Sequence, residues 1–126
     1  MKLLIIWVLC IILNILFAAI HSVLTKENSK ILHGVWGFIY ALICAIPFLI
    51  VDFNFKAVEL YISLVLLHLS VFPVVYNSFM ELPPFNLSKT TTALTDRFMV
   101  YIGLKNTAIV NIGAFIVSIT LLILSI

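Results

Sequence analysis

The first charge-free stretch, LLIIWVLCIILNILFAAIHSVLT, occupies residues 3–25 and decides the fold. A helix rises about 1.5 Å per residue, so this stretch is long enough to cross the ~30 Å hydrocarbon core of a bilayer. Three further stretches without a formal charge follow at residues 31–51, 60–80 and 106–126. All seven basic and all five acidic residues lie outside the four stretches. The sequence therefore predicts an all-α integral membrane protein whose four transmembrane helices form an antiparallel bundle.

Composition supports a membrane protein and excludes several other classes. Hydrophobic residues make up 64% of the 126 residues and charged residues only 10%, and a water-soluble globule of this composition would not cover its apolar surface. The net charge of +2 is too small to indicate a nucleic-acid partner. Cys10 and Cys44 lie inside predicted spans without a CxxC spacing, so no disulfide framework is expected. We predict a single transmembrane domain, residues 1–126, whose first span is retained rather than cleaved as a signal peptide.

The basic residues of the connectors predict how the chain crosses the membrane. Four spans place both termini and the connector at residues 52–59 on one side, with the connectors at residues 26–30 and 81–105 on the other. This other side carries five of the seven basic residues: Lys26, Lys30, Lys89, Arg97 and Lys105. Because cytoplasmic connectors are rich in Lys and Arg, we expect connectors 26–30 and 81–105 in the cytoplasm and both termini outside a bacterial inner membrane.

The connector at residues 81–105 is the longest and carries its own apolar pattern. Pro83 and Pro84 prevent the third span from continuing as a regular helix. Between residues 92 and 104 the apolar residues recur near helical spacing: Leu94, Phe98, Tyr101 and Ile102. This pattern predicts a short interfacial helix on the cytoplasmic side of the bundle. The alternative is an extension of the fourth span into the cytoplasm.

Polar residues inside the spans are candidates for the inward-facing surface of each helix, because a polar side chain in hydrocarbon needs protein or water around it. The candidate interior residues are Asn14, His68 and Asn111. Their simplest role is hydrogen bonding between helices. His68 lies near the middle of its span, where a charged imidazole is costly, and Pro73 frees a backbone carbonyl on the neighbouring turn. The alternative role is a proton or ion relay through the bundle.

A second set of candidates lies at the predicted cytoplasmic ends of the spans and in the third connector: His21, His33, Tyr76, Asn77, Asp96 and Arg97. Two histidines and one carboxylate could form an acid–base pair. Their spacing is unlike HExxH or a zinc ribbon, so we predict no metal, no cofactor and no catalytic residue. Arg97 is expected either to reach an anionic lipid headgroup, with Asp96 holding the connector against a histidine, or to form a solvated pair with Asp96.

Several short motifs occur together in the middle two-thirds of the chain: His33, Trp36 and Tyr40, then Phe72–Pro73, Tyr76–Asn77, Thr90–Thr92 and Asp96–Arg97. In this combination the chain resembles small uncharacterised multi-span membrane proteins of bacteria and their phages. In that group a similar Tyr-Asn ending is followed by a Thr- or Ser-rich loop and an acidic–basic pair. No activity is attached to the group, so the resemblance implies no catalytic residues. It does imply that the third connector carries the function.

Four short spans enclose little space, so a solute path inside one chain is not expected. We predict a structural or regulatory subunit of an oligomeric membrane complex, formed with copies of itself or with another membrane protein. One alternative is a homo-oligomeric pore, including holin-like and defence-effector roles. The other is a membrane-embedded enzyme or lipid-binding protein that uses His21, His33, Asp96 and Arg97, and an enzymatic role is the least expected of the three.

Overall fold

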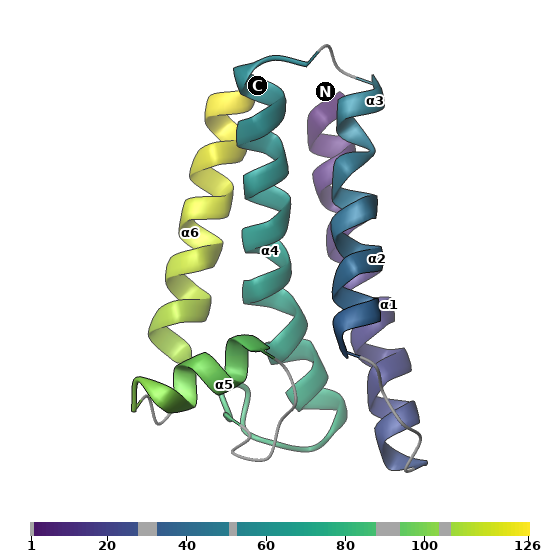
Figure 1. Ribbon diagram of the computed structural model, residues 1–126, viewed down its shortest axis with the longest axis vertical. Coiled ribbons are helices and arrows are strands. Elements are labelled where there is room, and N and C mark those ends of the chain that lie inside the picture. Colours follow the sequence, from purple (N-terminus) through teal and green to yellow (C-terminus); the bar gives the residue numbers. More distant parts are fainter. Residues whose placement is uncertain (1, 28–32, 51–52, 88–93, 104–106) are drawn as a thin grey trace.

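The computed structural model describes residues 2–27, 33–50, 53–87, 94–103 and 107–126. The helices in these ranges are α1 (Lys2–Lys26), α2 (His33–Ala45), α3 (Pro47–Ile50), α4 (Phe55–Phe79), α5 (Leu94–Tyr101) and α6 (Ala108–Ser125). Figure 1 shows the long helices side by side, with both chain ends at the same end of the bundle. Three of them, α1, α4 and α6, are long and apolar enough to cross a membrane. This confirms the prediction of an all-helical membrane protein.

The predicted second span, residues 31–51, is not one continuous helix. It is divided into α2 and α3 at Ile46. A proline has no backbone N–H, and a proline ring inside a helix clashes with the preceding turn, so Pro47 disfavours one continuous helix. The backbone tightens there, since the N–H of Ile46 donates to the carbonyl of Ile43 at 3.1 Å. With 13 residues, α2 alone rises only about 20 Å, which is too short for a hydrocarbon core.

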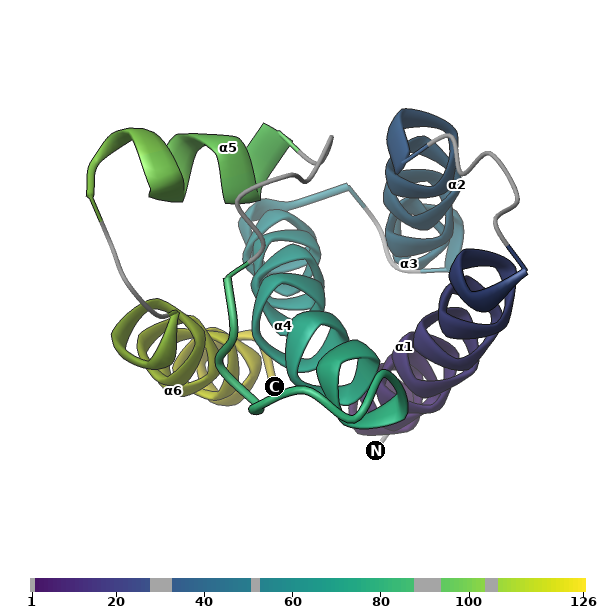
Figure 2. The same cartoon turned by 90° about the horizontal axis from the view of Figure 1, so that it is seen from below.

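The arrangement of the bundle is centred on α4. Seen along the helix axes in Figure 2, α4 lies between α6 and α1. On one side of that row lies α2, which side-chain hydrogen bonds join to both α1 and α4. The most extensive packing is between α4 and α6, followed by α1 and α4. By contrast, α6 has little contact with α1. As a result, α6 forms one edge of the bundle.

Buried polar residues recur along one stripe of α4 and one stripe of α6, and Ser63 and Ser118 bond to each other between the two helices. Each helix carries three buried ones at seven-residue intervals: Ser63, Ser70 and Asn77 on α4, and Asn111, Ser118 and Ser125 on α6. A seven-residue repeat keeps one stripe of a helix turned toward its partner. Small side chains on that stripe allow two membrane helices to approach closely. We refer to these six residues as the polar seam.

Both ends of α4 are defined by local hydrogen bonds. The Asn54 side chain caps the first turn by accepting from the backbone N–H of Ala57 at 3.0 Å. At the other end, Glu81 has a positive φ of 60°. The N–H of Glu81 donates to the carbonyl of Ser78, and the N–H of Leu82 donates to that of Asn77. This is a Schellman motif, a helix ending that glycine normally occupies.

The predicted short helix after Pro83–Pro84 is present as α5. It ends at Tyr101, and Gly103 then adopts a φ of 77° before α6 begins at Ala108. Figure 1 shows α5 lying across the bundle rather than along it. The alternative prediction, in which this segment extends the fourth span, is therefore wrong. The reason is the turn at Gly103, a conformation that residues with a Cβ rarely adopt.

Candidate functional site

A buried polar cluster joins three helices in the middle of the bundle. Asn14 on α1, Tyr40 on α2 and His68 on α4 contribute to it. Asn14 is 0% exposed and Tyr40 is 3% exposed. The Nδ2 of Asn14 donates to the Tyr40 hydroxyl at 2.8 Å, and its Oδ1 lies 2.6 Å from Nδ1 of His68. The structure thus brings together two of the predicted interior residues, Asn14 and His68, and adds Tyr40.

The hydrogen bonds determine which atom of each side chain donates. Nδ2 of Asn14 also lies 2.8 Å from the carbonyl oxygen of Cys10. A carbonyl can only accept, so the amide nitrogen must face it and Oδ1 must face His68. Since Oδ1 can only accept, Nδ1 of His68 carries the proton. The neutral imidazole therefore presents Nε2 as an acceptor. The Tyr40 hydroxyl completes the network by donating to the carbonyl of Leu64 at 3.2 Å.

Aromatic rings enclose the imidazole of His68. The ring of Tyr40 stacks on it with centroids 4.1 Å apart and an interplanar angle of 27°. Phe72, one turn further along α4, lies 4.9 Å away. These rings hold the side chain in one orientation and leave the cluster tightly filled. The alternative role of His68 in a proton or ion relay stays a prediction.

His21 on α1 lies against Phe72, the ring that also contacts His68. It is buried, and its ring makes edge contacts with Phe72 at 5.3 Å and with Trp36 of α2 at 5.2 Å. Further along, the Tyr76 hydroxyl lies 3.2 Å from Oγ1 of Thr25, so a side-chain hydrogen bond joins α4 to the end of α1. Tyr76 therefore holds these two helices together at the predicted cytoplasmic end.

A second polar cluster, in the half of the bundle nearer the termini, ties α1 to the polar seam. Nε1 of Trp7 donates to the hydroxyls of Ser63 and Ser118, at 3.2 and 3.3 Å. The two serines also bond reciprocally: Ser63 Oγ donates to the Ser118 carbonyl at 2.7 Å, and Ser118 Oγ to the Ser63 carbonyl at 2.8 Å. Sequence reasoning did not single out Ser63. The seven-residue spacing of the serines was the signal that could have found this cluster.

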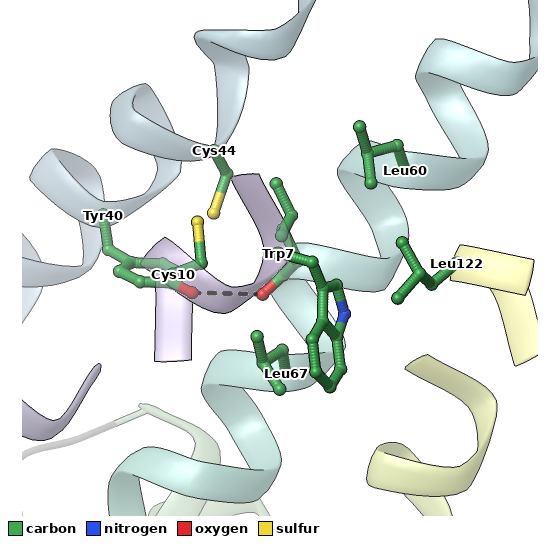
Figure 3. Close-up of a cluster of buried hydrophobic side chains, with 8 residues drawn as sticks. Trp7, Cys10, Tyr40, Cys44, Leu60, Leu67 and Leu122 are labelled. Atoms are coloured by element: carbon green, nitrogen blue, oxygen red, sulfur yellow. Dashed lines mark hydrogen bonds between the residues drawn. The ribbon is translucent and has the colours of Figure 1, made fainter. Parts of the chain in front are cut away.

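Apolar side chains pack around both clusters. Figure 3 shows Trp7 and Leu67 beside Cys10 and Cys44, whose sulfur atoms point toward one another across α1 and α2. Both cysteines are free and buried. Both therefore pack as small side chains in the interior. This packing also places two thiols face to face in the interior.

The other predicted site residues lie apart from the central cluster. Asn111 bonds within its own helix, because its Nδ2 donates to Oγ1 of Thr107 at 2.9 Å. Asn77 fixes the turn after α4, since its Nδ2 donates to the carbonyls of Pro84 and Asn86, both at 3.0 Å. Asn111 and Asn77 therefore have local structural roles.

Asp96 and Arg97 are carried by α5, where Asp96 is half-buried and Arg97 is exposed. The side chain of His33 lies outside the described residues, so the predicted convergence of His21, His33 and Asp96 stays a prediction. In the part of the chain that the structure describes, no three His, Cys, Asp or Glu residues come close enough to hold a metal ion.

A groove of about 230 Å³ opens between α4 and α6. Its walls include Val71, Val74, Ile112 and Phe115, with Phe85 from the turn after α4. The lining is almost entirely apolar, and both helices are candidate spans. The groove therefore suits a hydrocarbon chain or an apolar side chain better than a polar substrate.

No protein-family model, curated protein or solved structure matches this chain. The resemblance to small multi-span proteins of bacteria and phages therefore stays a prediction. What the three long apolar helices establish is the class: a small helical protein of the membrane.

Proposed function

We propose that this protein is a structural or regulatory subunit of an oligomeric membrane complex. The observation that supports this proposal is how the interior polar groups are used. Asn14 applies both its N–H groups and its oxygen to neighbours in the same chain, and Ser63 and Ser118 bond to each other. These groups hold helices together instead of lining a path or a substrate pocket, so the outer surface is left to carry the function.

The edge helix α6 offers the surface for a partner. Three isoleucines repeat at seven-residue intervals on its outer side, Ile109, Ile116 and Ile123, and they are 83%, 59% and 66% exposed. A straight ridge of branched side chains on a membrane helix packs well between the side chains of a second helix. We therefore place the partner, a second copy or another membrane protein, against this ridge of α6.

Purification in mild detergent with mass measurement of the intact assembly tests the proposal. A complex of fixed stoichiometry is expected, and Ile116→Trp on the ridge should dissociate it. Leu16→Trp is the matched control, because Leu16 is similarly exposed, at 52%, but lies on α1. A monomer for the unmodified protein would contradict the proposal. So would ion flux through vesicles that contain the purified protein alone, a result that would favour a pore.

The proposal includes four membrane crossings, with α2 and α3 together forming the second. The range from His33 to Ile50 rises about 27 Å if it is nearly straight. We place the connectors at residues 26–30 and 81–105 in the cytoplasm. Cysteines introduced at Glu27 and Phe53 should then react with a membrane-impermeant thiol reagent from opposite sides, only Phe53→Cys being labelled in intact cells. Labelling of both from one side would contradict this topology.

A further inference from the structure

The position of α5 relative to the spans identifies the environment around it. In Figure 1, α5 lies across the bundle at the level where α6 begins, at the end away from both termini. Figure 2 shows it beside the row of long helices rather than under α4. The helix makes little contact with any of the long helices. The surroundings of α5 are therefore mainly the medium outside the protein at the level where α6 begins.

The length of α6 locates that level in the membrane. Its 18 residues rise about 27 Å, close to the ~30 Å of a hydrocarbon core. The start of α6 thus lies near the boundary between hydrocarbon and headgroups. Because α5 lies across this start, its axis runs in the plane of that boundary.

The two sides of α5 differ in a way that suits this position. Asp96 and Met99 are half-buried, so they mark the side turned toward the rest of the chain. Phe98, Tyr101 and Ile102 recur at i, i+3 and i+4 and are 61%, 87% and 52% exposed. The apolar side of this helix therefore faces away from the protein.

We propose that this outward side of α5 binds the bilayer interface, with Arg97 pairing with the phosphate of an anionic lipid. Aromatic side chains with a polar tip, such as Tyr101, favour the headgroup level. An amphipathic helix in this plane buries its apolar side among the upper acyl chains. Arg97 is exposed next to this side, and a guanidinium matches a phosphate group with two parallel hydrogen bonds. A second copy docked symmetrically on the same side would instead bring two Arg97 side chains together.

Spin labels on α5 test where the helix lies. Phe98→Cys and Ile102→Cys, each labelled with a nitroxide in protein reconstituted into phosphatidylcholine–phosphatidylglycerol vesicles, should be more accessible to oxygen than to a water-soluble nickel chelate. Met99→Cys is the matched control on the inner side and should be less accessible to oxygen. Cys10 and Cys44 are buried and should take up little label. Ready access of the nickel chelate to the Phe98→Cys label would overturn the proposal, as would exclusion of both reagents, which would indicate protein packed there.

The lipid partner is tested separately with a charge variant. Arg97→Gln should lower the preference of the reconstituted protein for phosphatidylglycerol over phosphatidylcholine by about fivefold, the effect of one basic residue near an anionic surface. Lys56→Gln is the matched control, because Lys56 is exposed at the start of α4, the opposite end of the bundle. Equal preference in Arg97→Gln and the unmodified protein would overturn the assignment of Arg97. An equal loss in both variants would overturn it as well, since it would indicate a general charge effect.

Discussion

Replacing Asn14 with leucine should destabilise the bundle by about 2–4 kcal/mol. Leucine keeps the branched shape of the side chain, but it removes the bonds to the Tyr40 hydroxyl and to His68. Two interhelical bonds in a membrane protein contribute about 1 kcal/mol together. The Nδ1–H of His68 also loses its acceptor inside the bundle, which costs about 1–3 kcal/mol more. The free energy of unfolding, measured by titrating denaturing detergent into mixed micelles, reports the sum.

A matched substitution and a double variant separate this explanation from a general intolerance of change. Among the described residues, the bond that Asn111→Leu removes is one within a single helix, to Thr107, and the change should cost less than about 1 kcal/mol. In Asn14→Leu/His68→Phe the unpaired donor is gone while a ring remains to stack on Tyr40. The double variant should therefore be more stable than the sum of the single changes predicts, with a coupling of about 1–2 kcal/mol. Equal costs for the two asparagines, or strict additivity in the double variant, would refute the reasoning.

Three further experiments test separate features. Ser63→Ala should lower the unfolding free energy by about 1–2 kcal/mol because it breaks bonds between helices. Ser70→Ala removes a bond within α4 and should cost under about 0.5 kcal/mol. Similar unfolding free energies for the two variants would contradict the role of the bonds between Ser63 and Ser118. Glu81→Gly should raise the unfolding free energy by about 1 kcal/mol by relieving the left-handed backbone, and Glu81→Ala should not. A membrane-permeant copper oxidant should form a disulfide between Cys10 and Cys44. Alkylation of the denatured protein should then detect neither thiol. Retention of both thiols would show that the two sulfur atoms do not come into contact.

The charge-free stretches predict the three long helices well because hydrocarbon excludes formal charges. The first stretch, residues 3–25, became α1 almost residue for residue. The prediction was less accurate at the start of α4, which begins at Phe55 rather than residue 60. Its first five residues include two charged ones, Lys56 and Glu59, and Asn54 caps the first turn. Hydropathy does not report a helix that continues beyond the apolar core.

The second predicted span shows that hydropathy averaged over many residues does not detect a break within a helix. Residues 31–51 are as apolar as the others, yet Pro47 divides them through one missing N–H and one steric clash. Both effects act within a single turn. They change the mean hydropathy of the stretch very little, so only the position of the proline indicated the break.

The candidate sites were only partly predictable. Asn14 and His68 were identified as inward-facing, but their meeting depends on how α1 and α4 rotate and slide against each other, which neither helix determines alone. Asn111 fits the same inward pattern and nevertheless bonds to its own helix through Thr107. The contribution of Ser63 was missed because serine is small and common in spans. Its partner Ser118 lies 55 residues away in the chain.

The central position of α4 has a consequence for biosynthesis. The helices on either side of it, α1 and α6, have little contact with each other, and the Asn14–Tyr40 pair bonds onto α4 through Leu64 and His68. The ribosome must therefore complete α4, through Phe79, before the earlier segments can settle. Until that point Oδ1 of Asn14 and the O–H of Tyr40 lack the hydrogen-bond partners that α4 provides. Nascent chains interrupted before α4 should be preferred substrates for the proteases that survey newly inserted membrane proteins.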